Sequence, residues 1–417
     1  MKYHEITPLK TPVTKTIEIP GSKSYTNRAL VMAALTKGKV ILEHPLYSED
    51  TEVMIATLRQ LGLHIETKTE QIVVHDDISV IQDRSYDLYA KDSGTTIRFL
   101  LAMLCLTPGI KALGGSPRLN ERPIKELVEA LRLLGAKIDQ EQPPLKITSS
   151  SLSKGRKITL DASMSSQFLS ALLMISPLLE GLKIDLQGEL ISKPYVKMTL
   201  QAMQEWGVNV LETKQSYEIP GGQHYKKERY EIEGDFSSAG YFFAIAALTR
   251  STLTLKNLSC QSIQADREFL TILERMGNEI YTSDQGITIL GKQLLPLTLD
   301  MEKCPDQVQT MAVLAAFIPG ITKISGVRSL RVKETERVYA LRKELSKMGI
   351  RTEETPDTLT VYGGSPRAAL IETYGDHRMA MAFAVAGTHL PGMKIHQPEV
   401  VCKTFPTFWE KLGRLIR

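Results

Sequence analysis

The amino-acid sequence predicts an α/β protein of two similar lobes, each built from three βαβαββ units with buried central helices. Three observations support this prediction. The chain has 417 residues, 42% of them apolar, which is more than one hydrophobic core usually accommodates. Six segments share one pattern, in which a short strand and a cluster of small polar residues precede a strongly apolar helix. Most copies continue into an amphipathic helix that ends in glycine.

The apolar segments recur at a period of roughly 70 residues. They begin near Ser22, Asp92, Ser163, Asp235, Pro305 and Gly375. Because these helices lack a wide polar face, we expect them to lie buried in the centres of the lobes. Taken singly, each start is at least as well explained by ordinary helix capping. Six such starts with Lys and Arg beside them predict an anion site, because helix N-termini bind phosphate and carboxylate groups.

The amphipathic helices are expected over residues 52–61, 124–134, 196–206, 267–276 and 336–348. A glycine follows each of them, and a glycine in the left-handed region commonly ends a helix. We expect these helices and the sheets to wrap around the buried helices.

The lobe boundaries follow from the repeats. We expect the first lobe over residues 20–228 and the second over residues 1–19 plus 229–417. The polar run 221–228 separates the third and fourth repeats, so the crossing between lobes is predicted there. The last repeat lacks a closing strand, and the N-terminal strand, about residues 3–19, is expected to complete the second lobe.

Composition and charge argue against several classes of protein. The net charge of +4 is spread along the chain without a block of like charges, unlike a nucleic-acid-binding arm. The longest apolar stretches, such as 99–106 and 241–248, are far shorter than the ~20 residues of a membrane helix. The N-terminus has no apolar signal region, and the four cysteines are scattered. We therefore expect a cytoplasmic protein.

One motif resembles a known family closely. Residues 20–28 read PGSKSYTNR and resemble the signature PGSKSxxNR of the EPSP synthase family of enolpyruvyl transferases. Further motifs of that family are matched in the same order, at residues 92–98, 121–124, 165–168, 192–195, 331–337, 376–380 and 403–406. The resemblance therefore spans the whole chain.

The resemblance implies the inside-out α/β barrel fold of this family, with the active site in the cleft between the lobes. It also implies that the enolpyruvyl group of phosphoenolpyruvate is transferred to the 5-hydroxyl of shikimate 3-phosphate, in the shikimate pathway to chorismate and the aromatic amino acids. The reaction proceeds by addition and elimination and needs a cationic clamp, a base and an acid, but no metal or cofactor. We expect a monomer that acts on small molecules and binds neither nucleic acid nor a membrane.

The resemblance also implies roles for individual residues. The phosphoenolpyruvate site would consist of Lys23, Gly94, Arg122, Gln167, Arg337, Arg378 and Lys403. The shikimate 3-phosphate site would consist of Lys23, Ser24, Arg28, Ser165, Ser166, Gln167, Ser192, Tyr195, Asp306, Ser329 and Lys333. Asp306 would accept the 5-hydroxyl proton, Glu334 would protonate C3, and Lys23 would touch both substrates. Paired hydrogen bonds from planar guanidinium groups suit both anions of phosphoenolpyruvate.

Two departures from the family pattern concern Asp92, where Asn is usual, and the pair Ser329-Leu330, where Asn-Trp is usual. Ser329 is shorter than Asn, so it would reach the shikimate phosphate less directly or through water.

Two alternatives stay open. The sister family transfers the enolpyruvyl group to UDP-N-acetylglucosamine, but it has Asn where this chain has Ser24, and a reactive Cys on a loop that here, over residues 114–122, contains none. The second is a non-catalytic anion- or nucleic-acid-binding scaffold, which would not need Asp306 and Glu334 beside the cations.

Overall fold

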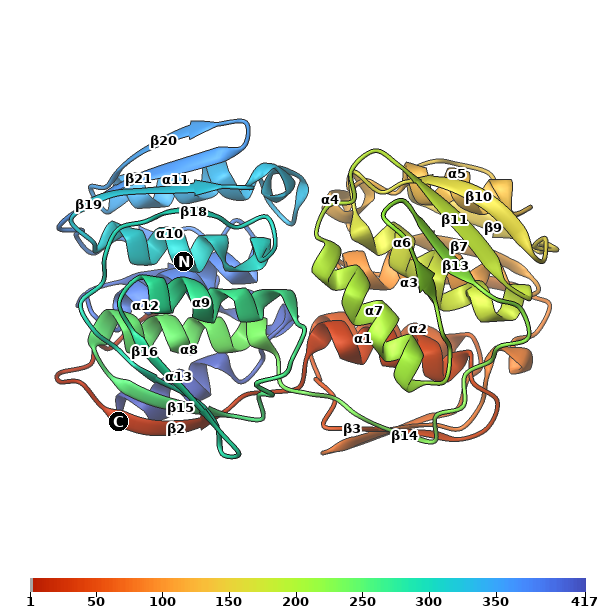
Figure 1. Ribbon diagram of the computed structural model, residues 1–417, viewed down its shortest axis with the longest axis horizontal. Helices are drawn as coiled ribbons and strands as arrows, with labels where there is room; N and C mark the ends of the chain where they lie inside the picture. The colour runs from red at the N-terminus through yellow and green to blue at the C-terminus, as the bar shows by residue number, and fades with distance from the viewer. Residues whose placement is uncertain (1–2) are drawn as a thin grey trace. The chain divides into compact units, whose positions relative to one another are not determined.

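The computed structural model describes residues 3–417, which form two compact units (Figure 1). The first unit is Gly21–Ile232, and the second unit combines the N-terminal stretch up to Pro20 with Glu233–Arg417. Each unit has its own hydrophobic core. Among residues 3–417, no helix combines the length and the apolar character that crossing a membrane requires.

The six predicted apolar helices are confirmed, and almost all of their residues are buried. In the first unit they are α1 (Lys23–Ala34), α3 (Gly94–Leu104) and α6 (Ser166–Ile175). In the second unit they are α8 (Phe236–Thr249), α10 (Val308–Ala316) and α12 (His377–Gly387). Five begin at a side-chain cap, which is Ser22, Ser93, Ser165, Asp235 or Asp376. Helix α10 instead follows the 3₁₀ turn η4 (Pro305–Gln307).

The amphipathic helices are confirmed with small shifts of their ends. They are α2 (Glu49–Gln60), α5 (Lys125–Leu133), α7 (Lys193–Glu205), α9 (Glu268–Arg275) and α11 (Arg337–Lys347), and α13 (Phe408–Ile416) occupies the sixth place. Helix α2 starts earlier than predicted because Ser48 and Thr51 form a reciprocal cap. The glycines after the five predicted helices all have positive φ, between 81° at Gly349 and 111° at Gly62.

Each unit contains three sheets that repeat one topology. The strand order in the first unit is β6 (Ser85–Tyr89), β7 (Ile110–Gly114), β9 (Leu145–Thr148), β8 (Lys137–Ile138); then β10 (Arg156–Asp161), β11 (Leu182–Gln187), β13 (Ser216–Ile219), β12 (Leu211–Glu212); and β14 (Arg229–Glu231), β3 (Val40–Glu43), β5 (Gln71–Val74), β4 (Ile65–Lys68). The first pair of each sheet is parallel and the other pairs are antiparallel.

The second unit has the same arrangement. Its strand orders are β2 (Thr14–Glu18), β15 (Thr252–Lys256), β17 (Gly286–Leu290), β16 (Glu279–Ser283); then β18 (Thr298–Asp300), β19 (Gly320–Ser325), β21 (Thr358–Gly363), β20 (Arg351–Thr355); and a shorter sheet of β22 (Leu370–Ile371), β23 (Lys394–His396), β1 (Tyr3–Glu5). Short helical segments complete the fold: α4 (Pro117–Asn120), η1 (Ile78–Val80), η2 (Ser176–Leu179), η3 (Ala265–Arg267), η5 (Arg328–Val332) and η6 (Pro398–Lys403).

The units exchange their leading strands. Strand β2 precedes α1 in the chain but pairs in parallel with β15 of the second unit, where Ile17 lies opposite Leu255. Strand β14 precedes α8 but pairs in parallel with β3 of the first unit, where Tyr230 lies opposite Leu42. The N-terminal segment was expected to complete the second lobe, and in the structure β2 pairs with β15 while the short β1 pairs with β23 of the last repeat.

The predicted crossing at residues 221–228 was wrong by a few residues. This run stays in the first unit, where the Tyr225 hydroxyl donates to the Met174 carbonyl at 2.8 Å. The chain leaves the unit only after Ile232, whose N–H donates to the Glu43 carbonyl at 3.0 Å. The pairing of β14 with β3 therefore sets this boundary.

Candidate active site

In the second unit, one buried arginine holds three carboxylates that come from different segments. Arg337, the first residue of α11, is 1% exposed. Its guanidinium donates to Asp376 at 2.7 and 3.3 Å, to Asp306 at 3.2 Å and to Glu334 at 2.9 Å. Burial opposes its charge, but the three carboxylates raise the pKa of Arg337 above its ordinary value. One predicted cation therefore contacts both the predicted base, Asp306, and the predicted acid, Glu334.

Arg378 extends this network from the start of α12. Its Nη2 donates to Asp306 Oδ2 at 2.6 Å, and its Nη1 lies 3.3 Å from the Tyr241 hydroxyl. The Arg378 N–H donates to Asp376, which caps the helix, at 2.9 Å. Burial raises the pKa of Tyr241 to about 12, so its hydroxyl stays neutral. Asp306 is consequently held between two guanidinium groups.

Two aspartates of this region have roles that the sequence reasoning missed. Asp376 has no exposed surface and binds both Nε and Nη2 of Arg337. Asp266 of η3 is buried beside the start of α8, where the Ser237 hydroxyl donates to it. Burial, followed by the charge of Asp306, raises the pKa of Asp266 to about 7. In sequence, both aspartates are indistinguishable from acids that cap or open a helix, and no pattern reveals their burial.

The remaining predicted residues of the second unit lie on short helical segments. Ser329 lies within η5, and Lys333 follows it directly before Glu334. Lys403 is buried at the end of η6, which packs against α12. The structure thus brings Asp306, Glu334, Arg337 and Arg378 into one hydrogen-bonded cluster and places Ser329, Lys333 and Lys403 on segments that adjoin it in sequence or packing.

In the first unit, the start of α1 presents two predicted cations. Lys23 Nζ lies 3.1 Å from Asp50 Oδ2 of α2. Arg28 is buried and donates to the Thr199 hydroxyl at 2.8 Å and to the carbonyls of Ser24 at 3.0 Å and Tyr195 at 3.1 Å. Burial lowers the pKa of Arg28 to about 10, which still leaves it charged near neutral pH.

The starts of α3 and α6 are joined by hydrogen bonds. Gln167 accepts from Arg98 at 2.7 Å and donates to the Thr95 hydroxyl at 3.2 Å. Arg122 lies against Gly94 so closely that a Cβ there would come within 2.8 Å of its Nη1. Glycine is therefore required at this position for the observed placement of the Arg122 guanidinium.

Three serines predicted to bind shikimate 3-phosphate lie at helix starts. Ser165 caps α6 by accepting from the Gln167 N–H at 3.3 Å, and Ser166 is the first residue of that helix. Ser192 precedes α7 with φ of 51°, a left-handed conformation that is rare for serine. The departure at Asp92 also has a structural role, because its carboxylate accepts a hydrogen bond from the Ser116 hydroxyl.

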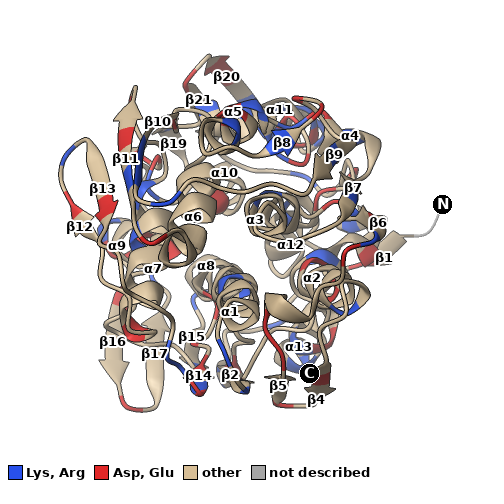
Figure 2. Cartoon of the chain, turned by 90° about the vertical axis from the view of Figure 1, so that its right-hand side faces the viewer, with Lys and Arg blue, Asp and Glu red and all other residues tan. Residues whose placement is uncertain are grey.

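Charges of both signs are interleaved along the elements of the part of the chain that the structure describes (Figure 2). Figure 2 shows Lys and Arg interleaved with Asp and Glu along the strands and helices. Many of these charges form exposed pairs between neighbouring strands, such as Lys157 with Asp185 and Lys183 with Glu218. Buried charges, by contrast, gather in the cluster that Arg337 and Arg378 form with their carboxylate partners.

Comparison with known proteins agrees with the geometry. The sequence model of the family described as EPSP synthase (3-phosphoshikimate 1-carboxyvinyltransferase) matches residues 9–412. A relative named 3-phosphoshikimate 1-carboxyvinyltransferase from Nostoc punctiforme is 41% identical over 99% of both chains, and one of the same name from Syntrophobacter fumaroxidans is 40% identical over 96% of both. A solved EPSP synthase from Acinetobacter baumannii superposes with a TM-score of 0.83 at 25% identity, covering 99% of this chain and 98% of that one.

These matches cover 96–99% of the length of the relatives, and the solved structure has the two-lobed inside-out α/β fold that the resemblance implies. The chain therefore belongs to the EPSP synthase family.

Proposed function

We propose that this protein transfers the enolpyruvyl group of phosphoenolpyruvate to the 5-hydroxyl of shikimate 3-phosphate, releasing phosphate. Membership of the family supports the reaction, since the relatives of about 40% identity carry this name. The observation that carries the proposal on this chain itself is the cluster in which Arg337 and Arg378 hold Asp306 and Glu334. Two cations with an acid and a base beside them suit an addition to an anionic alkene.

The proposed chemistry has two steps. In the addition, the 5-hydroxyl oxygen bonds to C2 of phosphoenolpyruvate, Asp306 takes the hydroxyl proton, and Glu334 donates a proton to C3. In the elimination, Glu334 takes a proton back from C3, the double bond re-forms, the bond from C2 to the phosphate oxygen breaks, and the proton held by Asp306 leaves with the phosphate. Glu334 directly follows Lys333 and accepts a hydrogen bond from Arg337. Without substrate, these two cations favour the ionised form of Glu334. We therefore propose that Glu334 becomes a competent acid once the trianionic substrate shares these cations.

The carboxylates of Asp306 and Glu334 occupy guanidinium donors that a bound phosphate or carboxylate would use. Arg337 gives one Nη donor to each of them, and Arg378 gives Nη2 to Asp306. We propose that phosphoenolpyruvate exchanges for these side chains, so that substrate binding frees both groups for proton transfer. The neutral Tyr241 and the doubly bonded Asp376 would hold the arginines in place during this exchange.

The first unit would supply the remaining groups for the same two substrates. Arg122 over Gly94, Gln167 and Lys23 would bind phosphoenolpyruvate together with Lys403 of the second unit. Arg28, Ser165 and Ser166 would bind the phosphate of shikimate 3-phosphate, since charged donors and helix starts suit phosphate. Its ring hydroxyls would meet Ser24, Ser192, Tyr195 and Lys333, with Ser329 nearby.

A phosphate-release assay tests this proposal directly. Phosphoenolpyruvate is offered with shikimate 3-phosphate, and in a parallel reaction with UDP-N-acetylglucosamine. We expect release only with shikimate 3-phosphate. Release only with the nucleotide sugar would contradict the proposed substrate.

We also propose that the enzyme acts as a cytoplasmic monomer. The buried Cys105 and Cys304 form no disulfide among residues 3–417, as suits a reducing compartment. Light scattering after size exclusion would test the oligomeric state, and a mass near twice 46.5 kDa would contradict it.

A further inference from the structure

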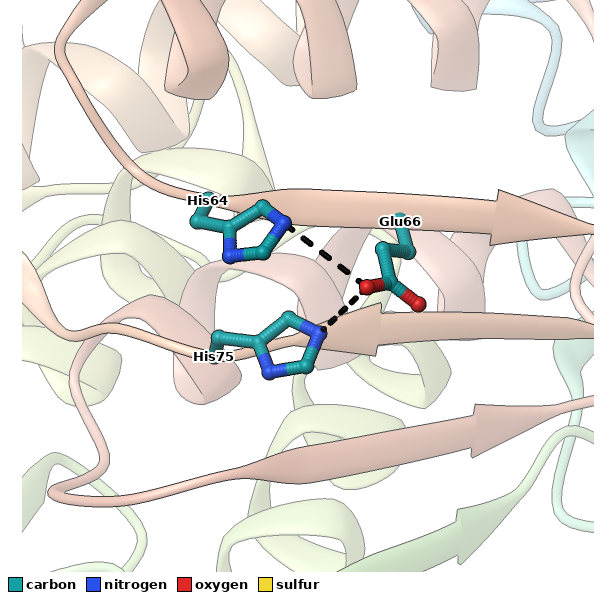
Figure 3. Close-up of side chains that lie close together, drawn as sticks. All are labelled: His64, Glu66 and His75. Carbon is teal, nitrogen blue, oxygen red and sulfur yellow. Dashed lines mark ion pairs between the residues drawn. The ribbon is translucent and has the colours of Figure 1, made fainter.

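Two histidines and a glutamate converge on a hairpin that the proposed reaction does not use. His64 directly precedes β4 and His75 directly follows β5, and the His75 N–H donates to the His64 carbonyl at 3.0 Å, which continues the antiparallel ladder. Their imidazole rings stack at a centroid distance of 4.4 Å with 13° between the planes. Glu66 is two residues beyond His64, so its side chain lies on the same face of the sheet. The backbone register therefore brings these three side chains together (Figure 3).

The distances resemble those between ligands of one metal ion. Oε1 of Glu66 lies 3.7 Å from Nε2 of His64 and 3.3 Å from Nε2 of His75. With metal–ligand bonds of about 2.0–2.2 Å, tetrahedral geometry places ligand atoms roughly 3.3–3.6 Å apart. The Nε2 atom of His75 is shielded from solvent and faces the carboxylate of Glu66.

Metal binding and hydrogen bonding require different tautomers here. An imidazole that carries its proton on Nε2 can donate it to the Glu66 carboxylate, whereas one with its lone pair on Nε2 presents an acceptor to that oxygen. In the second state both rings and the carboxylate direct lone pairs toward one another, and a cation between them would bind all three. All three ligand atoms lie within 4.8 Å of one another, so small rotations of partly exposed side chains would complete the site.

We propose that His64, Glu66 and His75 bind a divalent first-row transition metal ion such as Zn²⁺. Imidazole nitrogens with one carboxylate suit zinc, nickel or copper, whereas Mg²⁺ and Ca²⁺ prefer oxygen ligands alone. Three protein ligands leave one position of a tetrahedral ion open to water. Bound metal would join the two ends of the hairpin, outside the groups assigned to catalysis.

Calorimetric titration of the metal-free full-length protein with Zn²⁺ tests this proposal. We expect one ion per chain and at least tenfold weaker binding for each of His64→Gln, Glu66→Gln and His75→Gln. Mg²⁺ should give no comparable heat. His44→Gln is the matched control, because His44 pairs at 3.1 Å with one carboxylate, Glu70, in the same sheet but has no second imidazole. Equal affinity in the control and the three variants, or no binding by the unaltered chain, would overturn the proposal.

A second readout reports the place of binding independently of affinity. Zn²⁺ should slow amide hydrogen exchange over residues 64–75 in the unaltered chain and leave this segment unchanged in His75→Gln. Exchange that slows elsewhere but not in this hairpin would overturn the assignment.

Discussion

Replacing Asp376 by Asn tests whether the buried arginine network holds the second unit together. Asn has almost the same shape and caps a helix as well as Asp, so the hydrogen bond from the Arg378 N–H is retained. The substitution removes one negative charge from a site with no exposed surface, beside an arginine that is 1% exposed. Its effect therefore isolates the ion pair from the cap.

The size of the effect follows from burial. Removing one partner of a buried ion pair costs about 3–5 kcal/mol, because the other charge stays buried and unpaired. Arg337 keeps Asp306 and Glu334 as partners, so we expect a loss at the lower end, about 3 kcal/mol of unfolding free energy.

The two tryptophans provide a separate signal for each unit. Trp206 lies in the first unit and Trp409 in the second. In a Trp206→Phe background, urea unfolding followed by fluorescence reports Trp409 and hence the unit that contains Asp376. The same background without the Asp376 substitution is the reference.

An exposed ion pair of the same unit is the matched control. Glu410 pairs with Arg414 on α13, where both side chains are more than half exposed, so Glu410→Gln should cost less than about 1 kcal/mol. If Asp376→Asn costs no more than this control, the reasoning about the buried network is refuted.

Three further predictions concern the protonation of Asp266, the contact of Gly94 with Arg122, and the proposed acid Glu334. Folding raises the pKa of Asp266 from about 3.9 in unfolded chains to about 7. Ionisation of this carboxyl therefore costs the folded state no stability below pH ~4, and the cost grows with pH until pH ~7 and is constant above it. The difference in unfolding free energy between Asp266→Asn and the unaltered chain should therefore rise in favour of the variant by on the order of 3 kcal/mol from pH 5 to pH 8. Gly94→Ala would place a Cβ 2.8 Å from Arg122 Nη1 and should raise the KM for phosphoenolpyruvate about tenfold, since a lost charged hydrogen bond is worth roughly 1.5–3 kcal/mol. Glu334→Gln should lower turnover by about 100-fold or more while phosphoenolpyruvate still binds.

Each of these predictions has a result that contradicts it. A pH-independent difference between Asp266→Asn and the unaltered chain in urea unfolding would mean that Asp266 is ionised throughout. Gly413→Ala is the control for Gly94, because no atom lies within 4 Å of its added Cβ, and an equal rise of KM in both variants would exclude the contact with Arg122. Normal steady-state turnover of Glu334→Gln would remove it from the proposed acid role.

Local signals explain why the helices could be predicted from the sequence. Caps such as Ser22 and terminal glycines such as Gly62 act within one turn of the chain, so a single sequence reveals them. The sequence placed the N-terminal strand in the second lobe, but the return of β14 to the first unit could not be predicted in this way. Tyr230 is far from Leu42 in sequence, and either unit offers an edge of the same topology.

The candidate site was likewise predictable only in part from the sequence. The motifs predict which cations and carboxylates gather, and the structure joins Asp306, Glu334, Arg337 and Arg378 by hydrogen bonds. The parts played by Asp376 and Asp266 depend on burial and on partners from other segments, which residue spacing does not encode. The repeated βαβαββ pattern predicts helix starts beside cations, whereas packing determines which carboxylate contacts which arginine.

The bond that breaks in phosphoenolpyruvate tests the central claim most directly. With ¹⁸O in the oxygen that bridges C2 and phosphorus, addition and elimination breaks the bond between carbon and oxygen. We therefore expect the ¹⁸O in the released phosphate when shikimate 3-phosphate is present, together with a product heavier by the enolpyruvyl group, both measured by mass spectrometry. Retention of the ¹⁸O in pyruvate would show cleavage between phosphorus and oxygen and would contradict enolpyruvyl transfer.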